Sequence, residues 1–75
     1  MKIYPSVSAD VFNLEFNAQG DKKIQLFNLN GSLIQEYNTL DAGFRIDASN
    51  LGAGSYLIHV ALGQQMGIQK VVVIK

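Results

Sequence analysis

The sequence predicts an all-β domain, a seven-stranded antiparallel β-sandwich, and two observations carry this prediction. Apolar and polar residues alternate with a period of two over most of the chain. No stretch of ten residues shows the helical period of about 3.6 residues. Turn residues (Gly, Asn, Asp and Ser) interrupt the alternation about every ten residues. Short strands separated by such turns are typical of antiparallel sandwiches.

The individual strands follow from this alternation. The first is short because Pro5 cannot donate to a sheet, and a turn-rich link over 6–10 follows it. Asn30–Gly31 is the strongest hairpin signal, since both residues tolerate the positive φ of a type I′ turn. Other turns or loops are expected over 18–21, 39–43 and 63–67. The expected strands are 2–4, 11–17, 22–29, 32–38, 44–48, 55–62 and 68–74.

The chain of 75 residues is expected to form one domain, residues 1–75, with a small core. It contains no Cys, so packing alone must hold the fold together, which is unusual for a small exported domain. The residues expected to point inward are Ile3, Phe12, Leu14, Phe16, Ile24, Leu26, Ile34, Phe44, Ile46, Leu51, Tyr56, Ile58 and Val60.

The charge and hydrophobicity of the chain limit the classes of molecule and membrane that it is expected to contact. Six basic and six acidic side chains give a net charge of zero, which counts against nucleic acid as a partner. No apolar run approaches the roughly 20 residues of a membrane-spanning helix. Met1–Pro5 is too short and too quickly polar for a signal peptide. If the protein is exported, its amino-terminal signal therefore lies elsewhere, or Met1 is only the start of an excised fragment.

A glycine-rich corner precedes the sixth expected strand. Glycine adopts positive φ at no steric cost, so Gly52 and Gly54 suit a sharp change of direction. A tyrosine at the start of a strand commonly buries its ring and donates its hydroxyl to the backbone, which is the interpretation favoured for Tyr56 and for Tyr4. Tyrosine corners of this kind occur in fibronectin- and immunoglobulin-like sandwiches.

The last expected strand breaks the alternation. The run Val71–Val72–Val73–Ile74 fits either a strand covered on both faces or an edge strand whose outer face awaits a partner. Lys70 and Lys75 flank it in the manner of gatekeepers against aggregation.

No constellation of residues predicts catalysis, a cofactor or a metal site. The single His, His59, is expected on an outward strand face as a solvated or half-covered imidazole. The aspartates at 10, 21, 41 and 47 do not form a calcium-binding loop motif and are interpreted as turn and cap residues. Phe27, Tyr37 and Leu57 are expected to be exposed, either as cross-strand pairs or as a binding patch.

Four segments in order resemble one family. They are Tyr4–Pro5 with Asp10–Phe16, then Ile24–Ile34, then Ile46–Val60, and finally Lys70–Lys75 at the end of the chain. Together they resemble the C-terminal sorting domain of the type IX secretion system of Bacteroidetes, in a type A-like form. Ser6–Val7 stands where the family has Asn-Pro, Asn28 where it has Asp, and Gly52 where Pro is common.

The resemblance implies an immunoglobulin-like sandwich that serves as the secretion signal of a larger cargo protein. The partners that it implies are the type IX outer-membrane machinery, a sortase-like surface peptidase that removes the domain, and a cargo domain in cis. The route would run through the periplasm to the outer-membrane surface or the medium. The residues carried over as the sorting motif are Tyr4, Pro5, Gly31, Gly54, Tyr56, Lys70, Val71, Val72, Val73, Ile74 and Lys75.

Three alternatives stay open at this point. A non-catalytic adhesion or carbohydrate-binding sandwich would need a contiguous aromatic platform, and the chain has no Trp. A small hydrolase would need a polar pocket with converging titratable groups, which a single His makes a poor fit. A self-associating module could pair through the valine-rich edge strand.

Overall fold

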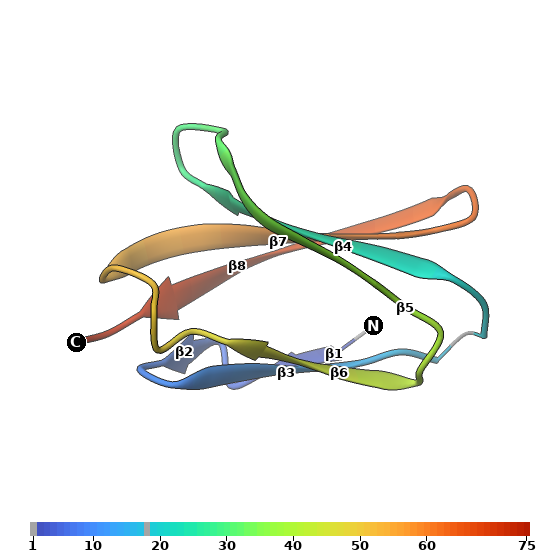
Figure 1. The fold of residues 1–75 in the computed structure, drawn as a ribbon, viewed down its shortest axis with the longest axis horizontal. Helices are drawn as coiled ribbons and strands as arrows, with labels where there is room; N and C mark the ends of the chain where they lie inside the picture. The colour runs from blue at the N-terminus through green and yellow to red at the C-terminus, as the bar shows by residue number, and fades with distance from the viewer. Residues whose placement is uncertain (1, 18) are drawn as a thin grey trace.

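The computed structural model describes residues 2–17 and 19–75, and it contains eight strands in two sheets packed face to face (Figure 1). The predicted all-β sandwich is confirmed, with eight strands rather than seven. Met1 and Ala18, to which the fragment start and part of the 18–21 turn were assigned, lie outside the described residues. None of the described residues belongs to a helix long and apolar enough to cross a membrane.

The smaller sheet has three antiparallel strands in the order β1-β3-β6. The middle strand, β3, points Phe12 and Leu14 into the core, and its other three residues are half-buried or exposed. This alternation is the period-two pattern read from the sequence. The bounds are Lys2–Tyr4 for β1, Val11–Glu15 for β3 and Gly43–Asp47 for β6.

The larger sheet has five strands in the order β2-β8-β7-β4-β5. All of its neighbours are antiparallel except β2 and β8, which run parallel. The expectation of a wholly antiparallel sandwich is therefore wrong at this one pair. The bounds are Val7–Ser8 for β2, Lys22–Asn28 for β4, Leu33–Thr39 for β5, Gly54–Leu62 for β7 and Gln65–Val73 for β8.

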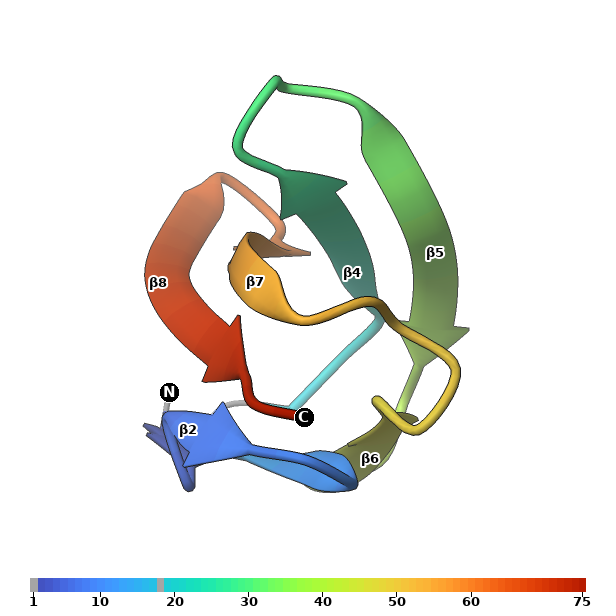
Figure 2. The ribbon, with the colours of Figure 1, turned by 90° about the vertical axis from the view of Figure 1, so that its left-hand side faces the viewer.

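The eighth strand, β2, lies within the segment expected to be a turn-rich link. Pro5 follows the end of β1, and β2 then pairs with β8 of the larger sheet. Figure 2 shows β2 just below the end of β8. The Tyr4–Pro5 peptide bond is cis. A strand of two residues is too short to show a period, so alternation could not reveal β2.

The core lies between the sheets and contains most of the residues expected there. Phe16, Phe44 and Tyr56 are only partly buried, but they pack against the core. Val71, Val73 and Ala48 join it, although they were not among the residues expected to point inward. The fully or nearly fully buried apolar residues are Ile3, Phe12, Leu14, Ile24, Leu26, Ile46, Ala48, Leu51, Ile58, Val60, Val71 and Val73.

The inward assignment of Ile34 is wrong, because this side chain is 40% exposed. On β5 it is Gln35 and Tyr37 that pair with the buried Leu26 and Ile24 of β4. Opposed residues lie on the same face of a sheet, so this register fixes Tyr37 inward and Ile34 outward. Tyr37, expected to be exposed, instead packs against Phe44 with ring centroids 5.0 Å apart.

One end of the core is closed by a fully buried lysine. The ammonium of Lys22 donates to the carbonyl oxygens of Gly20 (2.9 Å) and Asp41 (3.1 Å). It also lies 5.2 Å from the centre of the Phe16 ring. A buried charge needs such partners because it has lost its water. Lys22 therefore ties the turn before β4 to the loop between β5 and β6.

Candidate recognition surface at the carboxyl-terminal strand

The proposed sorting motif at the end of the chain is divided between core and surface. Val71 and Val73 point inward and are buried, and Val72 is half-buried on the opposite face. Lys70 and Lys75 are exposed, as is Ile74, which is 52% exposed. Because side chains alternate along a strand, Lys70, Val72 and Ile74 face outward, whereas Val71 and Val73 hold the strand in place.

The backbone edge of this strand is not vacant at the motif itself. β2 pairs with it in parallel, with Val7 opposite Val72 and Ser8 opposite Val73. The Val72 N–H donates to the Ser6 carbonyl oxygen at 2.9 Å, and the Ile74 N–H donates to that of Ser8 at 3.1 Å. Of the two alternatives for the Val71–Ile74 run, the edge strand that awaits a partner is therefore wrong at this position, because β2 already pairs with it. The sequence held no clear signal for this partner strand.

At the corner before β7 the expectation for Gly54 and Tyr56 is met, whereas Gly52, also expected to use positive φ, does not have it. Gly54 has a φ of +146°, a conformation that favours glycine. The Tyr56 hydroxyl donates to the Gly52 carbonyl oxygen at 2.7 Å, four residues earlier, while its ring packs on the core. This is a tyrosine corner, a feature of immunoglobulin-like sandwiches. The prediction for Tyr56 is confirmed.

The same corner holds the last residue of the chain. The Lys75 ammonium donates to the Ser49 carbonyl oxygen at 2.5 Å. Ser49 in turn donates from its hydroxyl and its backbone N–H to the Asp47 carboxylate, at 2.7 and 2.9 Å. These two hydrogen bonds, and then the charge of Lys75, hold the pKa of Asp47 below its usual range. Lys75 is thus anchored to the loop between β6 and β7.

The Gly31 hairpin is formed, but the expected turn type is wrong. Among the described residues no side-chain-bearing residue has positive φ, so Asn30 does not take the conformation that type I′ requires. Gly31, with φ +85°, closes a three-residue loop in which its N–H donates to the Asn28 carbonyl oxygen. The Asn28 side-chain oxygen accepts from the N–H groups of Asn30 and Ser32, at 2.9 and 3.0 Å. Asn28 therefore caps the turn with the acceptor oxygen that an aspartate would also supply.

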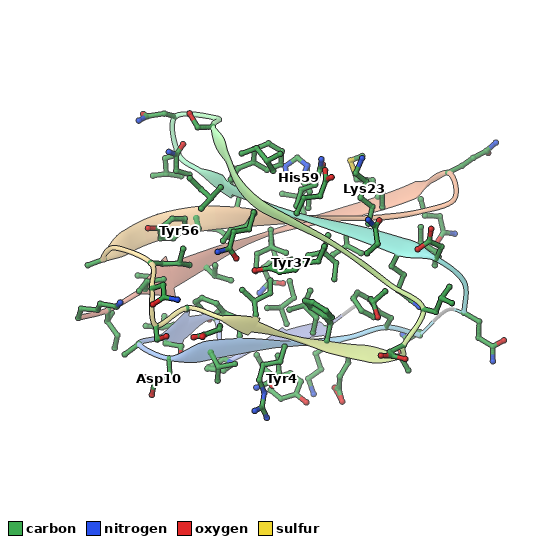
Figure 3. All side chains as sticks on the ribbon, in the orientation of Figure 1. Tyr4, Asp10, Lys23, Tyr37, Tyr56 and His59 are labelled. Atoms are coloured by element: carbon green, nitrogen blue, oxygen red, sulfur yellow. The ribbon has the colours of Figure 1, made fainter. Side chains whose placement is uncertain are left out.

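Tyr4 does not follow the buried-ring interpretation. It lies on the outer face of the smaller sheet and is 40% exposed, with the Lys2 ammonium 5.3 Å from its ring centre. Figure 3 shows Tyr4 beyond the smaller sheet and Tyr37 between the two sheets. Partial burial, followed by the charge of Glu15 and a hydrogen bond to it, raises the pKa of Tyr4. Pro5 directly follows β1, which ends at Tyr4.

Three of the four sequence segments meet in one row across the larger sheet, whereas the first, with Tyr4 on β1 and Val11–Glu15 on β3, belongs to the smaller sheet. Asn28, at the Gly31 turn, pairs with Tyr56, and Tyr56 pairs with Val71. One residue further along the terminal strand, Val72 pairs with Val7, which follows Tyr4–Pro5 in the chain. Figure 1 shows the β4–β5 turn, the corner before β7 and the carboxyl terminus at the same end of the molecule. The fold thus gathers three of the four segments, together with the link that follows Tyr4–Pro5, around the end of β8.

The remaining candidates for chemistry lie apart from this row. His59 is half-buried on the outer face, as expected, and its ring lies 4.7 Å from that of Phe27. In the same sheet the Lys23 ammonium lies 3.5 Å from the Glu36 carboxylate. Within residues 2–17 and 19–75, no three His, Cys, Asp or Glu side chains group to hold a metal ion. The exposed Tyr4 and the half-buried Phe27 lie on outer faces of different sheets, so they form no common platform.

Fold and surface together define a small β-sandwich whose terminal strand is anchored by its core valines and presents its alternate residues at one end. The family model described as secretion system C-terminal sorting domain matches residues 2–75, and the chain belongs to this family. Members of the family are signals for type IX secretion, which implies export to the cell surface or the medium. They act as sorting signals rather than as catalysts.

A curated relative carries a similar segment. The chain is 34% identical over 59 residues to an ulvan lyase, NLR42, from Nonlabens ulvanivorans. The match covers 77% of this chain but only 11% of the length of that enzyme. The shared segment is therefore a small part of the relative.

Proposed function

We propose that residues 2–75 are the export signal of a larger cargo protein, and that the type IX outer-membrane machinery recognises this signal by binding the end of β8. The observation that carries the proposal is the combination of the family match with the exposure of Lys70, Ile74 and Lys75 at one end of the fold. Their neighbours Val71 and Val73 are core residues, so the fold determines how the exposed ones are presented.

In this proposal the cargo lies before residue 2, passes through the periplasm, and loses the domain to a sortase-like surface peptidase. The ulvan lyase supports this organisation, since the matching segment makes up 11% of an enzyme. The domain itself contributes no catalysis, no cofactor site and no nucleic-acid site. Self-association through an edge strand is a further expectation of the same geometry, to be checked by sedimentation.

The test is a secretion assay with a reporter that is delivered to the periplasm and carries residues 2–75 at its carboxyl end. The host is a bacterium with a type IX system, and the readout is the fraction of reporter at the surface or in the medium. Deleting Ile68–Lys75 should abolish secretion. The deletion also removes Val71 and Val73 from the core, so it removes fold and signal together.

A charge reversal separates signal from fold. Lys70→Glu alters an exposed side chain and leaves the core intact, so the domain should stay folded while secretion falls several-fold. Arg45→Glu is the matched control, because Arg45 is also exposed but lies on β6 of the other sheet. Equal secretion of the two variants and the parent would refute the assignment of the recognised surface to β8.

A further inference from the structure

The edge of β8 is much longer than the strand that covers it. β8 spans nine residues, Gln65–Val73, whereas β2 pairs only with Val72 and Val73. Backbone N–H groups point to alternate sides along a strand, and those of Val72 and Ile74 point to β2. The N–H groups of Met66, Ile68 and Lys70 therefore point to the same edge, where the described part of the sheet has no further strand.

We propose that β2 is a displaceable strand, and that an extended segment of the export machinery replaces it along the whole edge of β8. This inference rests on the proposed function. β2 is two residues long and Val7 is 48% exposed, so little packing holds it. An incoming strand would form the hydrogen bonds that Ser6 and Ser8 now make and would add those of Met66, Ile68 and Lys70. Exchange therefore increases the number of paired backbone groups.

A hollow beside the uncovered half of the edge indicates which side chains the incoming segment carries. The hollow has a volume of about 330 Å³; Phe16, Val60, Leu62, Met66 and Gly67 line it, with the polar Asn17 and Gln65 beside them. Gly67 pairs with the inward-facing Val60 and has no side chain to fill the space between the sheets. A glycine within a strand often marks a place where another chain approaches closely. An apolar residue of the incoming strand fits this hollow.

The outward face of β8 indicates the charge of the incoming segment. Lys70 is exposed on that face, between Ile68 (56% exposed) and the half-buried Val72. Opposite charges on neighbouring strands stabilise a sheet, so an acidic residue is favoured next to Lys70. The partner is thus an extended protein segment with apolar residues facing inward and an acidic residue facing outward.

The first experiment needs only the isolated domain. Amide hydrogen exchange should be at least about tenfold faster at Val72 and Ile74, which β2 covers, than at Val71 and Val73, which face β7. The difference is expected because β2 can open while the rest of the sheet stays closed. Equal exchange at all four amides, at the rate of global unfolding, would overturn the proposal whatever the domain does in cells.

The second experiment locks β2 in place. Val7 and Val72 are register partners, so a V7C/V72C pair can form a disulfide, since neighbouring strands bring Cα atoms within about 4.4–6.8 Å. The control is K23C/N38C, a register pair between β4 and β5 that leaves β8 untouched. Both pairs are placed in the secretion reporter, together with V72C alone, which makes the same change on β8 without the disulfide.

The locked reporter should be retained at least about tenfold more than the K23C/N38C and V72C reporters, since only the lock blocks strand exchange. Secretion of the locked reporter at the parent level would refute strand exchange. Failure of the parent reporter to be secreted would refute the proposed function instead, and the exchange rates at Val72 and Ile74 would still decide whether β2 opens.

Discussion

Two glycines of the corner before β7 allow a sharp test of why the chain turns there. Gly52 and Gly54 are two residues apart, and neither meets a steric barrier to a methyl group. A Cβ on Gly54 would contact nothing within 4 Å, and one on Gly52 would lie 3.9 Å from the Tyr56 hydroxyl. They differ in conformation, because Gly54 has a φ of +146° whereas Gly52 is not among the residues with positive φ.

Replacing each glycine by alanine restricts the unfolded chain to a similar extent, so this contribution cancels between the two variants. Only Gly54→Ala adds a side chain at positive φ, which costs on the order of 1–3 kcal/mol. We therefore expect Gly54→Ala to be less stable than Gly52→Ala by about 1–3 kcal/mol. For a domain of this size, each kcal/mol lowers the melting temperature by about 4–8 °C.

The assay is equilibrium unfolding in urea with thermal melts of the parent and both variants under one set of conditions. An unchanged slope of free energy against urea would show that the same surface is exposed on unfolding in all three. Equal stabilities for the two variants would refute the argument that backbone conformation fixes glycine at position 54. A bulkier change, Gly54→Val, should unfold the domain first and reduce secretion only as a consequence.

Three further predictions concern the same end of the molecule. Tyr56→Phe removes the hydrogen bond to Gly52 and should cost about 0.5–1.5 kcal/mol in urea unfolding, whereas Tyr4→Phe, on the outer face, should cost less. Val73→Ala should destabilise by about 1–3 kcal/mol because Val73 is buried, and an Ile74→Ala variant of similar stability would contradict this assignment. The pKa of Asp47 is lower when folded than its unfolded value of 3.8, so its contribution to stability is present above that value and is lost as the pH falls through the folded pKa. Urea unfolding between pH 6 and 2 should therefore lose less stability for Asp47→Asn than for the parent, and parallel pH profiles would count against the effect.

Alternation predicted the strands well wherever one face is buried. The Phe12–Leu14 and Ile24–Leu26 pairs lie in the core as expected. It failed for Ile34, because the register between β4 and β5 decides which residues of β5 point inward, and single-strand periodicity does not contain that register. The local sequence pattern thus predicts where a strand forms, whereas the register with the neighbouring strand determines which of its side chains face the core.

In the candidate recognition surface, too, contacts between residues close in sequence were predictable, whereas pairings between the two ends of the chain were not. The Tyr56 hydrogen bond was predictable because it closes within four residues of the chain. The pairing of Ser6–Ser8 with Val72–Ile74 joins opposite ends of the sequence and rests on backbone atoms, which every residue type supplies. The burial of Val71 and Val73 was an open alternative, since an unbroken valine run does not tell which faces are covered.

The inward anchoring of Val71 and Val73 links partner binding to folding thermodynamics. A ligand that contacts Lys70 and Ile74 in their anchored arrangement binds only the native state, so it raises the apparent stability in proportion to the logarithm of its concentration. A loss of stability likewise lowers the apparent affinity for the ligand. A cavity made at Leu14, in the opposite sheet, weakens binding by enlarging the unfolded fraction without touching the contact surface. If the proposed function holds, the affinity of the domain for the export machinery also measures how completely the domain is folded.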